Sequence, residues 1–166
     1  MIIVHATIWY YTWLVILTIC LCFAGSLAII SCGIGWVQIG HSCYYFSKVK
    51  ATWSKARSSC RNLNGDLVVP TNAIANKAIW EVAKGKNMGY PWIGLLRHQD
   101  KKFYTIFGTN LSYTNWAPGE PSSPNSPYCG HFWPGRGKWD DDDCATLYRF
   151  ICQNQRCKFT HLFYFI

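Results

Sequence analysis

The chain has 166 residues, 50% of them hydrophobic and 17% aromatic, with no low-complexity tract and no internal repeat. This composition excludes a disordered or fibrous protein, and the length suits a single domain. The formal net charge is +8, and all sixteen Lys and Arg lie between Lys48 and Lys158. Such a surface is either simply solvated or attracts anionic glycans or lipid headgroups. Because no basic run alternates with aromatic residues, nucleic acid is not an expected partner.

The N-terminal 30 residues contain no Asp, Glu, Lys or Arg, and the stretch from Ile8 to Phe23 is almost wholly apolar. Small residues near Ala24 and Ala28 suit a cleavage site, so we predict a signal peptide over residues 1–28 and a secreted protein. The apolar run is also long enough to cross a bilayer, so the alternative is a type II membrane anchor with an extracellular domain. The lysines all follow the segment, which does not favour the anchor.

Nine cysteines are a high count for this length. Cysteines at this density indicate disulfides formed in an oxidising compartment, or a zinc site in a reducing one. No two of them have the C-x-x-C spacing of a zinc knuckle, so disulfides and export are the favoured interpretation.

The first half of the chain after this segment predicts a hairpin and two helices. Glycines divide residues 32–47 into two apolar pieces, as in a short hairpin. A helix follows that Thr52 caps and Asn64 ends, and a second helix runs over residues 72–84 after a short buried strand at residues 67–69. The inward faces are predicted at Trp53, Ala56, Cys60 and Leu63, and at Ala75, Ala78, Ile79 and Val82.

The second half predicts strands and loops. Residues 92–95 and 103–107 are expected strands, and Gly94 marks a place where another backbone comes close. Residues 116–138 are dense in proline and glycine, which predicts a long irregular loop of the kind that often carries function. A last strand is expected over residues 147–152, before a short apolar tail.

Four motifs follow one another in the order and spacing of a known domain: Cys32-Gly-Ile-Gly-Trp36 with Cys43-Tyr44, Trp92-Ile93-Gly94-Leu95, Trp116-x-x-Gly119-Glu120-Pro121, and Trp139-Asp140-Asp141-x-x-Cys144. Together they resemble the long form of the C-type lectin-like domain, over residues 32–153. The resemblance implies an α+β fold in which two helices pack on small antiparallel sheets. It also implies a long Pro/Gly-rich ligand loop, disulfide staples, and a short C-terminal tail at residues 154–166.

The resemblance implies a disulfide pairing that the cysteine positions alone leave open. By analogy the pairs are Cys60–Cys152, Cys129–Cys144 and Cys32–Cys43. Cys20 and Cys22 leave with a signal peptide, so Cys157 is the odd thiol. It either links two chains in a disulfide-bonded oligomer or stays an exposed free cysteine.

The resemblance further implies a calcium site in the ligand loop. The residues at the family's metal positions are Glu120, Ser122, Asp140 and Asp141. Ser122 and Asp140 stand where the family has Asn, and Pro127 stands where it has a further Glu. Three carboxylates remain while about one ligand is lost, so we expect Ca²⁺ binding that is weakened. The alternative is that the acidic run at residues 140–143 is only a solvated loop.

The implied ligand is a carbohydrate. Glu120, Ser122 and Asp140 are the expected polar contacts, and Trp133 is the expected ring that stacks on the sugar. The Glu-Pro order resembles the mannose-type motif, although an ionised Asp140 only accepts hydrogen bonds and Ser122 offers one hydroxyl donor. Trp116 and Trp139 are expected to be buried.

Three classes of function follow from these residues. The first is a calcium-dependent lectin, and the second is a lectin-like module that binds a protein or lipid partner without calcium. An enzyme is not expected, because no Ser-His-Asp or Cys-His arrangement is present and His41, His98, His131 and His161 show no catalytic or metal spacing. Asn110 begins a glycosylation sequon, which matters if the chain is secreted.

Overall fold

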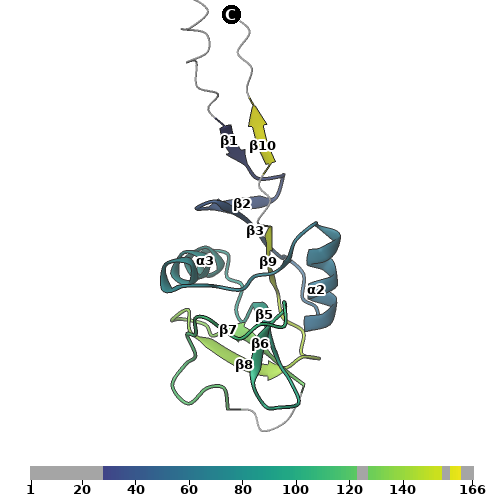
Figure 1. The fold of residues 1–166 in the computed structure, drawn as a ribbon, viewed down its shortest axis with the longest axis vertical. Helices are drawn as coiled ribbons and strands as arrows, with labels where there is room; N and C mark the ends of the chain where they lie inside the picture. The colour runs from purple at the N-terminus through teal and green to yellow at the C-terminus, as the bar shows by residue number, and fades with distance from the viewer. Residues whose placement is uncertain (1–27, 123–126, 155–157, 162–166) are drawn as a thin grey trace, which may run out of the picture. The chain divides into compact units, whose positions relative to one another are not determined.

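The computed structural model describes residues 28–122, 127–154 and 158–161 (Figure 1). The main unit, Ser31–Lys158, holds two four-stranded sheets and two helices in its described part. In the other unit β1 (Ala28–Ser31) pairs with β10 (Lys158–His161), a strand in the C-terminal tail that the sequence did not indicate. Residues 1–27 of the predicted signal peptide, and Cys157, lie outside the described residues.

The first sheet of the main unit joins its two ends. Its order is β2-β3-β9-β4, with β2 (Trp36–Ile39), β3 (Ser42–Phe46), β9 (Ile151–Asn154) and β4 (Asp66–Leu67) all antiparallel. The expected hairpin is β2–β3. The last strand begins at Ile151 and not at Leu147, because Tyr148 pairs with Ala51 only as an isolated bridge.

The second sheet has the order β6-β5-β7-β8 and carries the motif residues. Its strands are β6 (Phe103–Thr105), β5 (Trp92–Arg97), β7 (Tyr128–Phe132) and β8 (Trp139–Asp143). β7 lies inside the stretch predicted to be irregular. Pro127 and Pro134 flank this strand without interrupting it, so its main-chain N–H groups stay free to pair with both neighbours.

Helix α2 (Trp53–Asn62) begins where Thr52 Oγ1 accepts a hydrogen bond from the N–H of Lys55 at 3.4 Å. Asn64, with φ of 59°, follows its C-terminus. Trp53, Ala56 and Cys60 are buried as predicted. Leu63 instead is the C-cap and is 40% exposed, because the helix ends before its side chain can reach the core.

Helix α3 (Ala73–Gly85) begins at Asn72, whose Oδ1 accepts a hydrogen bond from the N–H of Ala75 at 2.8 Å. Its buried face is Asn76, Ile79, Trp80 and Ala83. The predicted face is therefore rotated, because pattern reasoning placed only apolar residues inward and the polar Asn76 finds buried partners. Within the described residues no helix is both long and apolar enough for a membrane span.

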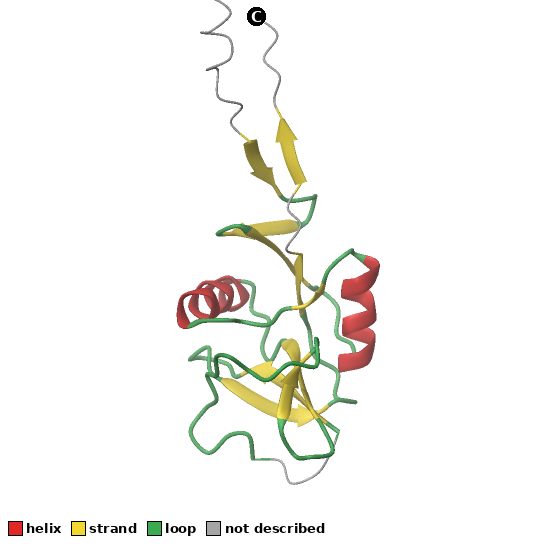
Figure 2. Ribbon diagram, viewed as in Figure 1, coloured by secondary structure: helices red, strands yellow, loops and turns green. Residues whose placement is uncertain are grey.

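The helices flank the strands of the main unit, with α2 and α3 on opposite sides of β9 in Figure 2. β5 lies close to the segment that follows β4, because the main-chain N–H of Gly94 donates to the carbonyl oxygen of Val68 at 2.7 Å. A Cβ at Gly94 would lie 2.9 Å from the carbonyl oxygen of Leu67. The close backbone approach predicted for this glycine is therefore present.

Three disulfides lie in the described chain, and they are the pairs that the family resemblance implies: Cys32–Cys43, Cys60–Cys152 and Cys129–Cys144. Cys60, Cys129 and Cys152 are fully buried in one apolar cluster with Trp53 and Trp92. Two of the disulfides are thus part of this core: Cys60–Cys152 ties α2 to β9, and Cys129–Cys144 ties β7 to the residue that follows β8.

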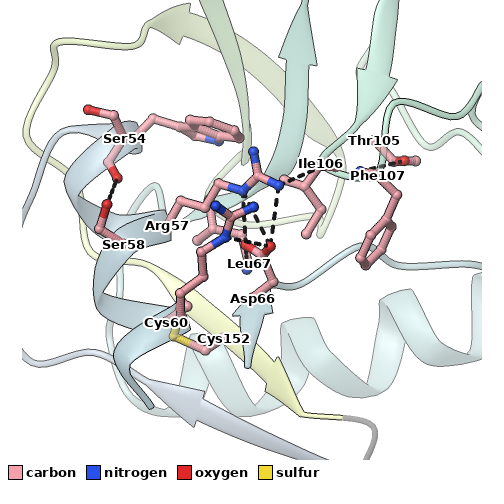
Figure 3. A network of polar contacts seen from close by, with 12 residues as sticks. Ser54, Arg57, Ser58, Cys60, Asp66, Leu67, Thr105, Ile106, Phe107 and Cys152 are labelled. Carbon is pink, nitrogen blue, oxygen red and sulfur yellow. Dashed lines mark hydrogen bonds and ion pairs between the residues drawn. A yellow bond between two sulfur atoms is a disulfide. The ribbon is translucent and has the colours of Figure 1, made fainter. Parts of the chain in front are cut away.

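Arginines of α2 form an ion pair with Asp66 of β4, and one of them also reaches the residue that follows β6 (Figure 3). The Nε of Arg57 donates to Asp66 Oδ1 at 3.1 Å, and its Nη2 donates to the carbonyl oxygen of Ile106 at 2.6 Å. Arg61 also donates to Asp66, at 3.3 Å, but its side chain is 59% exposed against 22% for Arg57. Since water screens exposed ion pairs, Arg57 is the partner that matters for stability.

We expect Arg57→Met to lower the free energy of unfolding by about 1–3 kcal/mol, because it leaves the Ile106 carbonyl and the Asp66 carboxylate without their half-buried donor. Arg61→Met should change it by less than about 0.5 kcal/mol. Urea denaturation of both variants measures the difference. Equal losses would contradict the assignment.

Two of the three disulfides close loops of very different length, which gives a second prediction about stability. Cys60 and Cys152 are separated by 92 positions and Cys32 and Cys43 by 11. On the chain-entropy model, replacing the first pair by alanines should cost about 4–5 kcal/mol and replacing the second about 3 kcal/mol. Thermal unfolding of the two double variants tests this order, which the reverse ranking would refute.

Candidate metal and ligand site

The acidic run of the sequence forms strand β8, at one edge of the second sheet. Because side chains alternate along a strand, Trp139 and Asp141 point to the core side and are buried, whereas Asp140 is half-buried on the other side. Asp143 is exposed near the end of the strand. The run is therefore not a uniformly solvated loop, since Asp141 is only 7% exposed.

The ligand loop lies alongside this edge. Trp116 forms a parallel bridge with Trp139. The main-chain N–H of Trp139 donates to the carbonyl oxygen of Asn115, and its main-chain carbonyl oxygen accepts from the N–H of Ala117, both at 2.8 Å. A turn closed by the N–H of Glu120 and the carbonyl of Ala117 follows, at 3.0 Å. These main-chain bonds bring Glu120 next to β8.

The carboxylates of Glu120, Asp140 and Asp141 converge, with one oxygen from each lying within 4.8 Å of the others. Glu120 precedes Pro121 in a cis peptide bond. The main-chain N–H of Ser122 donates to Glu120 Oε2 at 2.8 Å and to Asp141 Oδ1 at 3.1 Å. Ser122 thus joins the cluster through its backbone.

The donor set fits a hard divalent cation. All three side chains offer oxygen, which Ca²⁺ prefers, and none offers the sulfur or nitrogen typical of structural zinc. Asp140 Oδ1 accepts from the N–H of Asp141 at 2.8 Å, which holds that carboxylate against the strand. The arrangement can therefore bind a cation and still offer acceptor oxygens to a hydroxyl-rich ligand.

His131 lies beside the cluster, which the sequence did not indicate. It is 2% exposed and sits opposite Asp140 in the β7–β8 ladder, with Nε2 3.8 Å from Asp140 Oδ2. Its Nδ1 is 3.0 Å from the carbonyl oxygen of Phe132. Only the strand register reveals this neighbour, because the two residues are nine positions apart in a stretch predicted to be irregular.

Of the three tryptophans, Trp139 is buried as expected, Trp116 is only half-buried, and Trp133 is accessible. Trp139 is fully buried and packs edge-on against Trp116, with ring centroids 5.7 Å apart. Trp133 is 41% exposed in the turn between β7 and β8. Its main-chain N–H donates to the carbonyl oxygen of Lys138 at 2.8 Å.

The structure also describes two other positions singled out in the sequence, Pro127 and Asn110. Pro127 lines a cavity of about 480 Å³ together with residues of the β5–β6 turn. None of the three carboxylates of the acidic cluster lines this cavity. Asn110 is exposed and forms a bridge with Tyr104, so its side chain is accessible.

Tyr148 packs near the same strand. Its hydroxyl donates to Asp142 Oδ2 at 2.7 Å, and its ring lies 5.3 Å from that of His131. Burial, and then the hydrogen bond to Asp142, raise the pKa of Tyr148 well above its ordinary value because both favour the neutral phenol.

This shift predicts a loss of stability at high pH. The folded state holds the Tyr148 proton more tightly than the unfolded chain, so its contribution is complete below a pH of about 10 and is lost as the pH rises toward the folded pKa. We expect the free energy of unfolding to fall more steeply above that pH in the wild type than in Tyr148→Phe. Parallel curves in alkaline urea titrations would exclude the shift.

A protein-family model described as the Lectin C-type domain matches residues 49–154. The chain therefore belongs to the C-type lectin domain family, and its two helices, two antiparallel sheets and disulfides have the architecture expected from the resemblance. With this family assignment the chain is a non-enzymatic binding protein, as predicted.

Proteins similar to this chain include a lithostathine and a receptor. Lithostathine-1 of Mus musculus is 32% identical over 130 residues, which cover 75% of this chain and 79% of the relative. Asialoglycoprotein receptor 1 of Rattus norvegicus is 33% identical over 138 residues, covering 76% of this chain but 45% of the receptor. The similarity to the receptor is thus confined to less than half of its length.

Solved structures of similar fold include a sugar complex and a calcium-independent antifreeze protein. A complex of SPL-1 with GlcNAc has a TM-score of 0.68 and 25% identity, and the match covers 75% of this chain and 96% of that one. A calcium-independent type II antifreeze protein has a TM-score of 0.67 and 25% identity, with 77% and 97% covered. The fold alone therefore leaves the ligand open.

Proposed function

We propose that this domain is a calcium-dependent, carbohydrate-binding lectin whose site is the cluster of Glu120, Asp140 and Asp141. The observation that supports this most directly is the convergence of three carboxylates within 4.8 Å, from a loop and a strand some twenty positions apart. Like charges so close together repel one another, and a divalent cation relieves that repulsion.

Each residue of the proposed site makes a different contact with the sugar. Bound calcium would supply the positive charge that attracts sugar hydroxyl oxygens. Glu120 and Asp140, both half-buried, accept hydrogen bonds from those hydroxyls, and the exposed Ser122 offers a hydroxyl donor. Trp133, in the adjacent turn and 41% exposed, packs on the apolar face of the ring.

The sugar we propose is of the mannose type. The support is the Glu120-Pro121 order, which resembles the mannose-type motif, together with the acceptor-rich character of the site. Glycan binding in general gains support from the family and from the neighbour solved with GlcNAc.

The second candidate is a calcium-independent module for a protein or lipid partner. Two features favour it: Ser122 and Pro127 stand where the resemblance implies ligands with carbonyl or carboxylate oxygens, and the N–H of Ser122 already bridges two of the carboxylates. The similarity to a calcium-independent antifreeze protein supports a calcium-independent role.

The deciding experiment compares Asp141→Asn with Asp143→Asn on immobilised mannose. Asp141→Asn removes a charge from the cluster at nearly constant size and should weaken calcium binding and calcium-dependent retention about tenfold or more. Asp143→Asn is the matched control, because Asp143 is an exposed carboxylate of the same strand and its Oδ1 accepts from the N–H of Ala145. Retention of the full chain is measured with calcium and after EDTA.

Elution by EDTA, with loss of retention in Asp141→Asn alone, would support the lectin. Retention that persists in EDTA would discard the calcium-dependent mechanism. If calcium binds and mannose does not, the site stands and the mannose type is wrong.

Three further predictions concern the whole chain. They are export by a signal peptide at residues 1–28, with the membrane anchor as its alternative, glycosylation at Asn110, and a disulfide-linked oligomer through Cys157. The exposure of Asn110 supports the second, and the disulfides of the domain support an oxidising compartment.

A further inference from the structure

Helix α3 reaches the site through a single buried amide. Asn76 is 4% exposed, and both ends of its side chain are used. Its Oδ1 accepts from the indole N–H of Trp139 at 2.7 Å, and its Nδ2 donates to the carbonyl oxygen of Gly137 at 2.9 Å. Asn76 therefore holds the turn before β8 and the first residue of β8 at once.

A second asparagine meets the same carbonyl from the ligand loop. The Nδ2 of Asn115 donates to the carbonyl oxygen of Gly137 at 2.8 Å, and its Oδ1 accepts from Lys138 Nζ at 2.9 Å. Gly137 thus receives two amide donors, one from α3 and one from the loop. We call Asn76, Asn115 and the Gly137 carbonyl the asparagine cluster.

The turn packs closely against α3 at Gly137. Gly137 has φ of 63°, and a Cβ there would lie 2.7 Å from the ring of Trp80. Only glycine fits such a conformation and such a contact. The carbonyl that both asparagines bind is therefore fixed against the helix.

Both arms of the proposed metal site begin at this cluster. Asp140 and Asp141 directly follow Trp139, whose indole Asn76 holds. Glu120 follows Asn115 through the bridge at Ala117 and the turn that Glu120 closes. The cluster thus lies at the point where the strand and the loop that supply the carboxylates are joined.

We infer that Asn76 and Asn115 are positioning residues, which set the separation of Glu120 from Asp140 and Asp141 before any cation binds. The three carboxylates repel one another, so the loop and β8 would move apart unless contacts outside the cluster hold them. The asparagine cluster supplies such contacts, as residues behind the direct ligands do in metal sites generally. The role in calcium binding rests on the function proposed above, whereas the positioning of the loop does not.

The first test needs no metal. Amide hydrogen exchange of the full chain in EDTA reports the bonds made by the N–H groups of Ala117, Glu120 and Ser122. In Asn115→Ala, a half-buried position, we expect exchange at these amides to rise about tenfold or more, with Asn76→Ala as a second variant. Arg57→Met is the control, because it weakens a contact on α2 away from the loop.

Unchanged exchange in Asn115→Ala would overturn the inference, and so would an equal increase at these amides in Arg57→Met, since that would report general destabilisation only. Increased exchange confined to the asparagine variants would establish the positioning role whatever the metal does.

The second test is calorimetric titration of the same chains with calcium. We expect the dissociation constant to rise about 10- to 100-fold in Asn115→Ala and to stay within about twofold in Arg57→Met. A wild-type chain that binds no calcium would refute the proposed function and leave the exchange result to decide the positioning role. Calcium binding that is equally tight in Asn115→Ala would refute the role of the cluster in the metal site.

Discussion

Trp139 is fully buried, and its indole and main-chain groups bond to three residues in two parts of the chain, helix α3 and the ligand loop. Its indole N–H reaches α3 through Asn76, and its main-chain N–H and carbonyl bond to the loop at Asn115 and Ala117. The next two residues are the carboxylates of the candidate site. Because a large ring in the core admits one orientation, its burial decides which way Asp140 and Asp141 face and how near Glu120 can come.

The carboxylate cluster of the candidate site is acidic in an otherwise basic protein. The chain carries a net charge of +8, yet half of its eight acidic residues stand in one strand, at residues 140–143. Two main-chain N–H groups, from Ser122 and Asp141, bond to the clustered carboxylates. These donors stabilise negative charge in part. The remaining repulsion is what makes a cation the natural partner of this edge.

Elements that depend on short-range sequence signals could be predicted from the sequence. The helix at Thr52 and the strand at Trp92 follow from capping and from apolar runs, and Gly94 stands where the backbones of two strands meet. Strand β7 could not be found, since prolines on either side dominate the composition of that stretch. Asn76 was overlooked for a different reason, because pattern reasoning assigns buried positions to apolar residues and cannot see a distant hydrogen-bond partner.

The sequence by itself determined the class of fold, the carboxylates available for a cation and the glycines that turns require, because these depend on residue type and short-range spacing. The tertiary structure alone decided that Glu120 lies beside Asp141, that His131 lies opposite Asp140 and that Asn76 holds Trp139. Each of these pairs joins residues separated along the chain. Their meeting depends on strand register and helix packing, which only the folded core establishes.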